Sequence, residues 1–428
     1  MADDSGKTLL KVTFLFALQI LLPAVLVVLT PRCSVLRFAG IPLMSFFAYH
    51  IYFLSPQLSN SVFHNSFLAC EGIIAVTHCI NLLLLHSGVT WDDLVRHGAG
   101  SRSAGFIAKV LGAARLVVSL RGVNTGWEVK NLPSHPSFLT RERKSVSTSS
   151  FLLRQVGILA WQYLFLDLLL AVTLQEPPEN TDKFYSPGME FAYLDATAEQ
   201  WFIRAFTPFV SWYAVSRLLL DSTWRALSVI FVGAGLDTPE DWRPLFGSMW
   251  QSYTLRHFWG KFWHQILRWP FTSLTSFVTR DILQLPHPSL VERYTNISLV
   301  FLMSGILHGV SANIMGLSAM GSGALSFFPS FALGIIIEDT IQAAWTRITS
   351  PRPQATTPIW QKLVGFIWVQ FWMSVTAPWY MYPSRRILAN QAAWAMPYNV
   401  TAKLGIPSVL GLLGIYGVFV KFVFETSL

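Results

Sequence analysis

Long apolar segments separated by shorter polar loops run through the whole chain. About nine of them approach or exceed the ~20 residues that an α-helix needs to cross the hydrocarbon core of a bilayer. This pattern predicts an all-α fold, a polytopic transmembrane helical bundle with about nine spans. The predicted spans are residues 9–29, 35–54, 62–85, 151–172, 201–232, 295–316, 323–345, 359–382 and 406–424.

The stretch 266–285 has apolar residues but is not a clean span. The residues that interrupt it are Arg268, Pro270, Arg280 and Asp281. We predict that this stretch is re-entrant or interfacial. Backbone that is not helical is tolerated at membrane depth only where it is buried in protein or lines a cavity.

The composition agrees with a membrane protein. Of the 428 residues, 52% are hydrophobic and only 13% are charged, whereas a soluble domain has about 25% charged residues. The formal net charge is +8, but the basic residues gather in loops beside apolar segments, so nucleic acid is not an expected partner. Three cysteines in apolar surroundings are too few for a disulfide framework or a zinc site.

The charge of the loops orients the predicted spans. The loop 86–150 is basic, so we predict that it faces the cytosol. Its basic residues include Arg96, Arg102, Lys109, Arg115, Arg121, Lys130, Arg141, Arg143 and Lys144. The loop 174–200 is acidic and is predicted to face the lumen. Its acidic residues are Glu176, Glu179, Asp182, Glu190, Asp195 and Glu199.

The loop 382–403 breaks this charge rule. Threading the spans places it in the lumen, yet it carries Arg385, Arg386 and Lys403. The sequon that begins at Asn399 is a glycosylation site only if this loop is lumenal. The same threading places the N-terminus in the lumen.

His308 is the only ionisable residue in the apolar segment 295–316. A titratable group in hydrocarbon is costly, so it usually faces a cavity or a partner and marks a functional site. The alternative is a structural histidine, hydrogen-bonded between helices. The same segment has small residues at the spacing that lets helix backbones pack closely. These residues are Gly305, Gly309, Ala312 and Gly316.

An aromatic box at 255–265, with the sequence LRHFWGKFWHQ, holds two histidines and two tryptophans. His257 and His264 lie seven residues apart, which places them on one face if the box is helical. Gly260 makes a continuous helix less favourable. The alternative is an interfacial aromatic belt whose histidines face water.

The block 121–131, RGVNTGWEVKN, follows a mixed apolar and basic stretch at 105–120. The stretch has near-helical spacing and predicts an amphipathic helix on the membrane surface. The glycines of the block and Asn124 predict a defined turn. Its charges suit an anionic ligand or, equally, lipid headgroups.

Several kinds of chemistry have no support. The ten histidines are scattered, which does not fit a di-iron or other metal site, and no nucleophile elbow, P-loop or dinucleotide fingerprint is present. A neutral imidazole such as His308 suits general-base work on a hydroxyl. Cytosolic Arg and Lys residues suit a phosphate-bearing carrier. These residues are therefore compatible with acyl transfer.

Three sequence blocks together resemble the wax-synthase-like branch of the membrane-bound O-acyltransferases. They are DWRPLFG at 241–247, the box at 255–265 and SGILHG at 304–309. The block 121–131 is similar to one in fungal members, several of which acetylate terpenoid or meroterpenoid alcohols. The resemblance implies an acyl-CoA-dependent enzyme of the endoplasmic reticulum membrane, with His308 as the catalytic histidine. A polar residue, often Asn, closes the box in the wider superfamily, and here His264 follows Trp263.

This resemblance leads to a predicted mechanism without an acyl-enzyme. His308 takes the proton from the substrate hydroxyl as it attacks the thioester, and His264 or a backbone N–H donates to the oxyanion. Arg256 and Lys261 are the candidate ligands of the carrier phosphates, or else they hold the membrane interface. Trp259 and Trp263 are the candidate lining of the carrier path, or else they pack the fold.

The predicted reaction is O-acetylation of a hydrophobic terpenoid or meroterpenoid alcohol. Acetyl-CoA is the co-substrate, no permanent cofactor is expected, and the partners are the alcohol, the acyl donor and the bilayer. Wax-ester or sterol acylation with a longer donor is one alternative. A transporter is another, supported by intramembrane charges such as Glu71, Arg217 and Asp221. We predict one multi-pass domain over 1–428, with a cytosolic loop at 86–150 and a catalytic core at 233–316.

Overall fold

The computed structural model describes residues 2–59, 61–85, 88–136, 146–173, 178–349, 357–388 and 398–424. Within these ranges the chain forms helices joined by turns and loops, with no β-strand, which confirms the all-α prediction. Arg141, Arg143, Lys144 and Glu176, which the sequence placed in charged loops, lie outside the described residues.

The chain divides into two compact units, each built from two segments. The first unit comprises Met1–Lys130 and Gln265–Ile336, and the second comprises Asn131–His264 and Ile337–Leu428. Compact units of this kind need not fold independently. The prediction of a single domain over 1–428 therefore stays a prediction.

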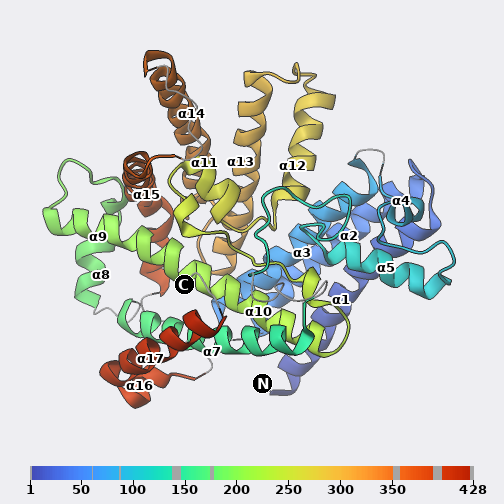
Figure 1. The fold of residues 1–428 in the computed structure, drawn as a ribbon, viewed down its shortest axis with the longest axis horizontal. Coiled ribbons are helices and arrows are strands. Elements are labelled where there is room, and N and C mark those ends of the chain that lie inside the picture. The colour runs from blue at the N-terminus through green and yellow to red at the C-terminus, as the bar shows by residue number, and fades with distance from the viewer. Residues whose placement is uncertain are drawn as a thin grey trace. The chain divides into compact units, whose positions relative to one another are not determined.

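The first unit contains the N-terminal helices and a later group of three (Figure 1). Its helices are α1 (Ala2–Leu29), α2 (Val35–Leu54), α3 (Val62–Leu83), α4 (Trp91–Arg96), α5 (Phe106–Val118), α12 (Arg268–Ser276), α13 (Leu290–Ile314) and the first half of α14 (Ala324–Thr349).

The second unit contains the remaining helices. They are α7 (Thr148–Thr173), α8 (Pro178–Tyr185), α9 (Ala198–Pro208), α10 (Arg217–Gly233), α11 (Leu255–His257), the second half of α14, α15 (Ile359–Leu388), α16 (Val400–Leu404) and α17 (Ile406–Phe424).

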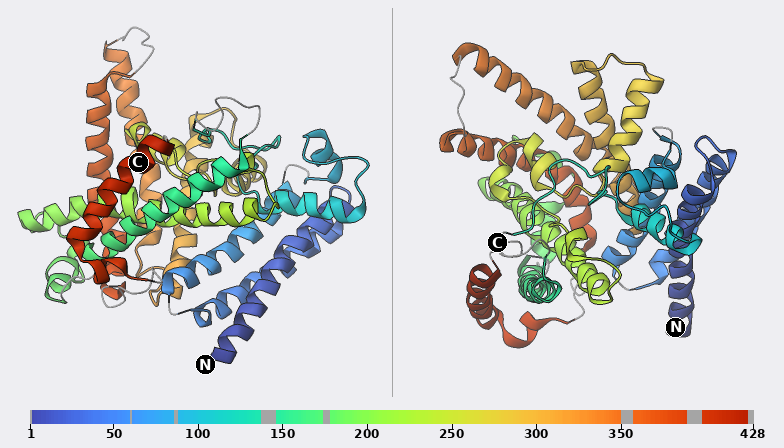
Figure 2. Two further views of the ribbon diagram at one scale, coloured as in Figure 1. Left: turned by 60° about the horizontal axis from the view of Figure 1, so that its bottom comes forward. Right: turned by 45° about the vertical axis from the view of Figure 1, so that its right-hand side comes forward.

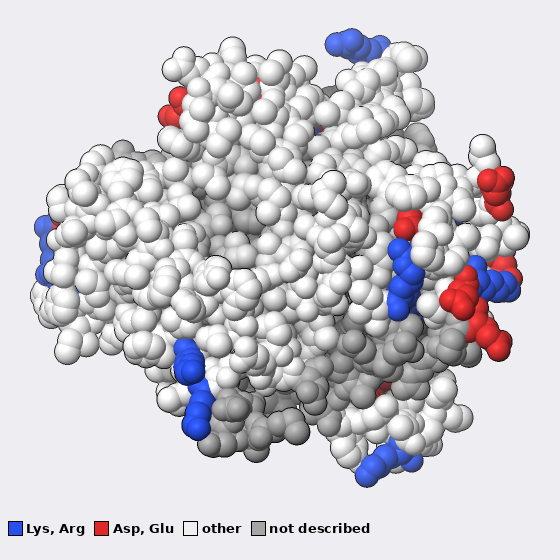
Figure 3. Space-filling view, turned by 180° about the vertical axis from the view of Figure 1, so that it is seen from behind, with Lys and Arg blue, Asp and Glu red and all other residues white. Residues whose placement is uncertain are grey.

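Among the described residues, seven helices are long and apolar enough to cross a membrane. They are Gly6–Leu29, Val35–Gln57, Val62–Leu83, Thr148–Val172, Leu290–Ile314, Ala324–Thr349 and Ile406–Phe424. Figure 3 shows a face on which charged side chains are few. The polytopic membrane prediction is confirmed, and seven of the predicted spans correspond to these helices.

The other two predicted spans are helical but are not among these seven. The stretch 201–232 is divided into α9, a π-helical segment at Phe209–Ser216, and α10, which carries Arg217, Asp221 and Arg225. The stretch 359–382 belongs to α15. The count of nine spans stays a prediction.

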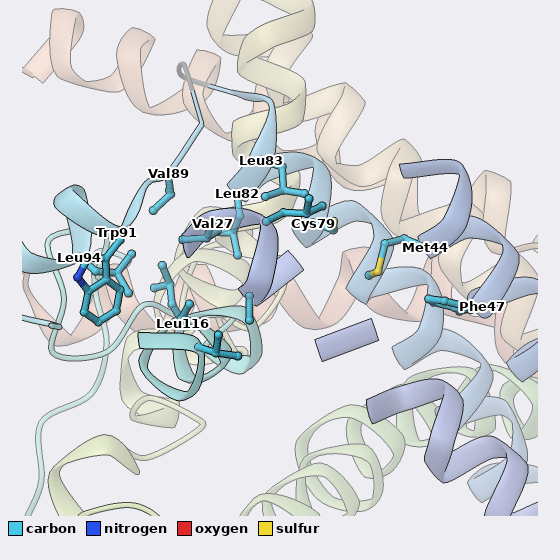
Figure 4. Packing of buried hydrophobic residues seen from close by; sticks show 14 residues of the cluster. Val27, Met44, Phe47, Cys79, Leu82, Leu83, Val89, Trp91, Leu94 and Leu116 are labelled. Atoms are coloured by element: carbon cyan, nitrogen blue, oxygen red, sulfur yellow. The ribbon is translucent and has the colours of Figure 1, made fainter. Parts of the chain in front are cut away.

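The apolar core of the first unit is drawn from α1 to α5 (Figure 4). Val27 of α1, Met44 of α2, Leu82 of α3 and Leu116 of α5 meet there. Arg37 is fully buried beside this core and donates hydrogen bonds to the Thr30 hydroxyl (2.8 Å), the Thr30 carbonyl (2.9 Å) and the Leu83 carbonyl (3.3 Å). The Arg37 side chain therefore links the C-terminal ends of α1 and α3.

The block 121–131 forms the turn that its sequence predicts. Gly122 (φ 56°) and Asn124 (φ 60°) have left-handed backbones, which glycine and asparagine adopt most readily. The Val129 N–H donates to the Arg121 carbonyl (3.1 Å), and the Asn124 N–H donates to the Glu128 carboxylate (3.0 Å). The predicted turn is confirmed, while its contact with a ligand or lipid stays a prediction.

The stretch 266–285 forms α12 and a π-helical segment at Phe277–Ile282. Helix α12 packs on α3 and α13, and Figures 1 and 2 show α12 and α13 side by side. The helical part is shorter than the ~20 residues of a span. It agrees with a re-entrant or interfacial segment, which remains the prediction.

The basic pair that broke the charge rule has an acidic partner. The Arg386 guanidinium bonds to the Glu190 carboxylate at 3.2 and 3.3 Å and to the Tyr185 carbonyl at 2.7 Å. Arg385 lies over the Tyr185 ring at 5.5 Å. Glu190 belongs to the acidic stretch 174–200 and Arg386 to the last turn of α15, so these contacts join the two segments. The side of the membrane that they face stays a prediction. Asn399 is exposed and caps α16.

Candidate active site

His308 lies in α13 of the first unit and is partly buried. Its imidazole stacks flat on the ring of Phe328 from α14, with 4.2 Å between ring centroids and 7° between the planes. Phe328 is only 1% exposed. The contact therefore holds the imidazole against a buried ring on one face.

Two glycines of α13 allow a close approach of the segment that follows, Gly305 to the start of α14 and Gly309 to the turn before it. A Cβ added to Gly305 would lie 3.0 Å from the Ala324 carbonyl oxygen, and one added to Gly309 would lie 3.2 Å from the Ala319 Cβ. The approach at Gly305 confirms its predicted role in close helix packing, whereas Gly309 packs against a turn. Gly316 instead follows the end of the helix with φ 89° and belongs to a turn. Phe328, one helical turn after Ala324, was not predicted from the sequence.

Helix α13 is held from another side by α3 and α12. Ile74, Phe271 and Leu307, one from each of these helices, form a buried apolar cluster. The Cys70 thiol lies 3.6 Å from the Leu307 carbonyl oxygen. The residue directly before His308 is therefore anchored in the core of the first unit.

The aromatic box lies in the second unit and is not a continuous α-helix. After one turn of α11, Phe258–Phe262 is π-helical and the Trp263 N–H donates to the Phe258 carbonyl at 2.7 Å. Trp263 then adopts an extended backbone with φ −67° and ψ 152°. The condition under which His257 and His264 would share a helical face is therefore not met, because the helical segment ends before His264.

The aromatic side chains of the box form the interior of the second unit. Phe258 and Phe262 are 0% exposed and Trp263 is 6% exposed. Trp263 stacks on Phe258 (5.8 Å) and meets Trp212 edge-on (5.0 Å). Trp259 is only partly buried, at 5.8 Å from Trp212. Of the two tryptophans proposed for the carrier path, Trp263 packs the fold and Trp259 is the more accessible.

Arg256 is held by acidic residues of α14 within the same unit. Its guanidinium forms an ion pair with Asp339, with 3.2 Å from Nε to Oδ1 and a second contact from Nη2 to Oδ2. The adjacent Glu338 accepts the N–H groups of Leu255 (2.7 Å) and Arg256 (3.4 Å). The two carboxylates thus hold the start of the box. The Lys261 side chain is partly buried.

The loop that carries DWRPLFG packs on the end of the box. The Gly247 N–H donates to the Phe262 carbonyl at 2.9 Å, and a Cβ at Gly247 would lie 2.2 Å from the Lys261 carbonyl oxygen. His264 is partly buried, and its ring centroid lies 6.0 Å from that of Phe246. His264 belongs to the second unit and His308 to the first.

Burial, together with the positive charges of Lys261 and Arg256, lowers the pKa of His257 below its ordinary value. Since the unfolded chain then binds the proton more readily, the protein loses stability as the pH falls below about 6.5 towards the folded pKa. We expect His257→Gln to lose less stability than the wild type between pH 7.5 and pH 5. Thermal unfolding in detergent measures this difference. The control is His64→Gln, which replaces an exposed histidine. An identical pH dependence in all three proteins would contradict the prediction.

The spanning helices and these sequence blocks define a multi-pass membrane acyltransferase. Residues 242–330 match the model of the Membrane bound O-acyl transferase family, and the match includes the box and His308. The chain belongs to this family, as full-length relatives also establish. The family resemblance drawn from the sequence is confirmed, and of the classes left open the enzyme is selected over the transporter.

The relatives that match over most of their length are named as fungal acetyltransferases. Acetyltransferase atnC of Arthrinium sp. is 62% identical, over 100% of both chains. Acetyltransferase pyr8 of Aspergillus fumigatus is 41% identical over 92% of each chain. Acetyltransferase TRI7 of Fusarium sporotrichioides is 37% identical over 92% of this chain and 90% of the relative.

Proposed function

We propose that this acyltransferase transfers an acetyl group from acetyl-CoA to a hydroxyl group of a hydrophobic secondary metabolite, a terpenoid or meroterpenoid, in the endoplasmic reticulum membrane. The names of the full-length relatives support acetyl as the group transferred. The observation that carries the mechanism is the imidazole of His308, stacked on Phe328 within a helix of membrane-spanning length.

His308 acts as the general base. The neutral imidazole takes the proton of the alcohol as the hydroxyl oxygen attacks the thioester carbonyl. The tetrahedral intermediate then collapses, the C–S bond breaks, and the imidazolium returns the proton to the departing thiolate. The products are the acetate ester and free CoA. Stacking on Phe328 supports this role because it restricts the orientation of the ring.

The box contributes to binding and to the oxyanion. His264, or a backbone N–H near it, donates a hydrogen bond to the oxygen of the tetrahedral intermediate. Lys261 binds a phosphate of the carrier, and Trp259 lines its path. Arg256 is engaged by Asp339, so its role is to position the box for the donor. Trp263 supports the site through packing.

Microsomes that express the chain test this function. They are incubated with labelled acetyl-CoA, or with a longer acyl-CoA, and a panel of terpenoid, sterol and fatty alcohols. We expect labelled ester from acetyl-CoA and a terpenoid alcohol, and none from microsomes that lack the chain. Product only from longer donors with fatty alcohols or sterols would replace the proposal with wax-ester or sterol acylation. The absence of product with every donor would overturn it.

A further inference from the structure

A group of buried charges lies between α7 and α10 of the second unit, which pack side by side (Figure 2). The Asp221 carboxylate accepts hydrogen bonds from Arg225 (2.7 Å) and Gln162 (2.6 Å). Arg225 also donates to the Gln155 side chain at 2.5 Å. Asp221 and Arg225 therefore neutralise each other's charge.

The positive charges of this group exceed the negative ones. Among the described residues, three guanidinium groups, those of Arg154, Arg217 and Arg225, interact with one carboxylate, that of Asp221. Helix α7 is one of the candidate membrane spans. Positive charge that is buried without a counter-charge is costly, and a site that keeps it is suited to an anionic ligand.

Arg217 is the member of this group with the fewest hydrogen-bond acceptors around its buried Nε among the described residues. Arg154 donates its Nε–H to the Phe424 carbonyl at 3.3 Å, and Arg225 is paired with Asp221. The Arg217 Nε is buried and has no hydrogen-bond acceptor among the described residues. Its Nη1 lies 4.0 Å from the sulfur of Met249, a weak acceptor, and its guanidinium lies 5.9 Å from the centre of the Phe246 ring.

Phe246 connects this arginine to the aromatic box. Its ring centroid lies 5.2 Å from that of Trp263 and 6.0 Å from that of His264. A ligand that binds beside Phe246 at the edge of the box would therefore lie near the Arg217 guanidinium. The planar, permanently charged fork of arginine matches phosphate geometry.

We propose that Arg217 binds a phosphate group of the acyl donor, an assignment that rests on acetyl-CoA as the donor in the proposed function. A phospholipid headgroup is another source of phosphate. The donor is favoured because Phe246 also contacts His264 and Trp263 in the box, within the segment matched to the family. Arg217 is thus a specificity residue for the donor. It supplies the positive charge for phosphate that Arg256 does not offer, because Arg256 is paired with Asp339.

Steady-state kinetics of the purified protein in detergent test this assignment. We expect Arg217→Gln to raise the KM for acetyl-CoA by roughly 10–100-fold with little change in kcat, because the charged hydrogen bond is lost. Arg217→Lys should recover part of the loss. Arg347→Gln removes an exposed positive charge from α14 and should match the wild type. A fall in kcat with an unchanged KM would overturn the assignment.

Ligand-induced shifts of the thermal unfolding midpoint separate this inference from the proposed function. CoA should stabilise the wild type but not Arg217→Gln, whereas pantetheine, which lacks phosphate, should affect both equally. Without ligand, Arg217→Gln should be no less stable than the wild type, since an uncompensated charge is removed.

Lower stability in the absence of ligand would indicate a structural role and overturn the proposal. Stabilisation through Arg217 by phosphatidylserine instead of CoA would overturn it as well. If CoA stabilises through Arg217 but no alcohol is acetylated, only the proposed function fails.

Discussion

Replacing His308 with alanine is expected to lower acetyl transfer by about 10²–10⁴-fold, the usual contribution of a general base. The change removes the only imidazole of α13 while alanine preserves the helix, because alanine has the highest helix propensity. The variant should therefore accumulate in the membrane at the wild-type level. The measurement is labelled ester formed by microsomes per amount of expressed protein.

His64→Ala is the matched control for this experiment. His64 also lies in a membrane-spanning helix of the first unit, α3, but it is exposed. It should retain the activity of the wild type. Equal product from the wild type and from His308→Ala would remove His308 from the chemistry and leave it a packing residue on Phe328.

Replacing Gly247 with alanine is the second change with a large expected effect. The added Cβ would lie 2.2 Å from the Lys261 carbonyl oxygen and 3.4 Å from the Phe262 Cα. Both are backbone atoms, so neither can move aside by a change of rotamer. We expect overpacking of this kind to cost about 1–3 kcal/mol, together with a loss of activity, because the loop and the box must separate. Thermal unfolding in detergent and the microsomal assay measure the two effects.

Gly233→Ala is the control for Gly247→Ala within the same unit. It ends α10, and a Cβ there has nothing within 4 Å. This variant should unfold at the wild-type temperature and keep its activity. A Gly247→Ala protein with unchanged stability and activity would show that the loop and the box do not approach each other as closely as the structure has them.

Local sequence patterns were sufficient to predict the membrane-spanning helices and the family. Runs of about 20 apolar residues predict spanning helices because length and hydropathy are properties of one segment. The role of Gly305 in close helix packing was predictable for the same reason, since small residues four apart share a helix face. The segment 201–232 was harder, because a π-helical stretch and three charged side chains are compatible with several arrangements.

Long-range contacts decided the roles of individual side chains in the aromatic box, which the sequence did not determine. Arg256 was a reasonable candidate for phosphate binding until α14 brought Asp339 to it from 83 positions along the chain. His257 and His264 do not share a helical face, because the helical segment ends at Phe262, where the Gly247 N–H donates a hydrogen bond to the Phe262 carbonyl. Neither pairing leaves a periodic signal in the sequence.

The sequence by itself determined the membrane-spanning helices, the family and the identity of His308 as the candidate base, because each depends on composition or order within short segments. Only the tertiary structure decided which groups remain available for ligands. It placed Phe328 on His308, paired Arg256 with Asp339, and left Arg217 beside Phe246 with its Nε unbonded among the described residues. The physical reason is that burial and pairing are set by side chains from distant segments, which a local pattern does not encode.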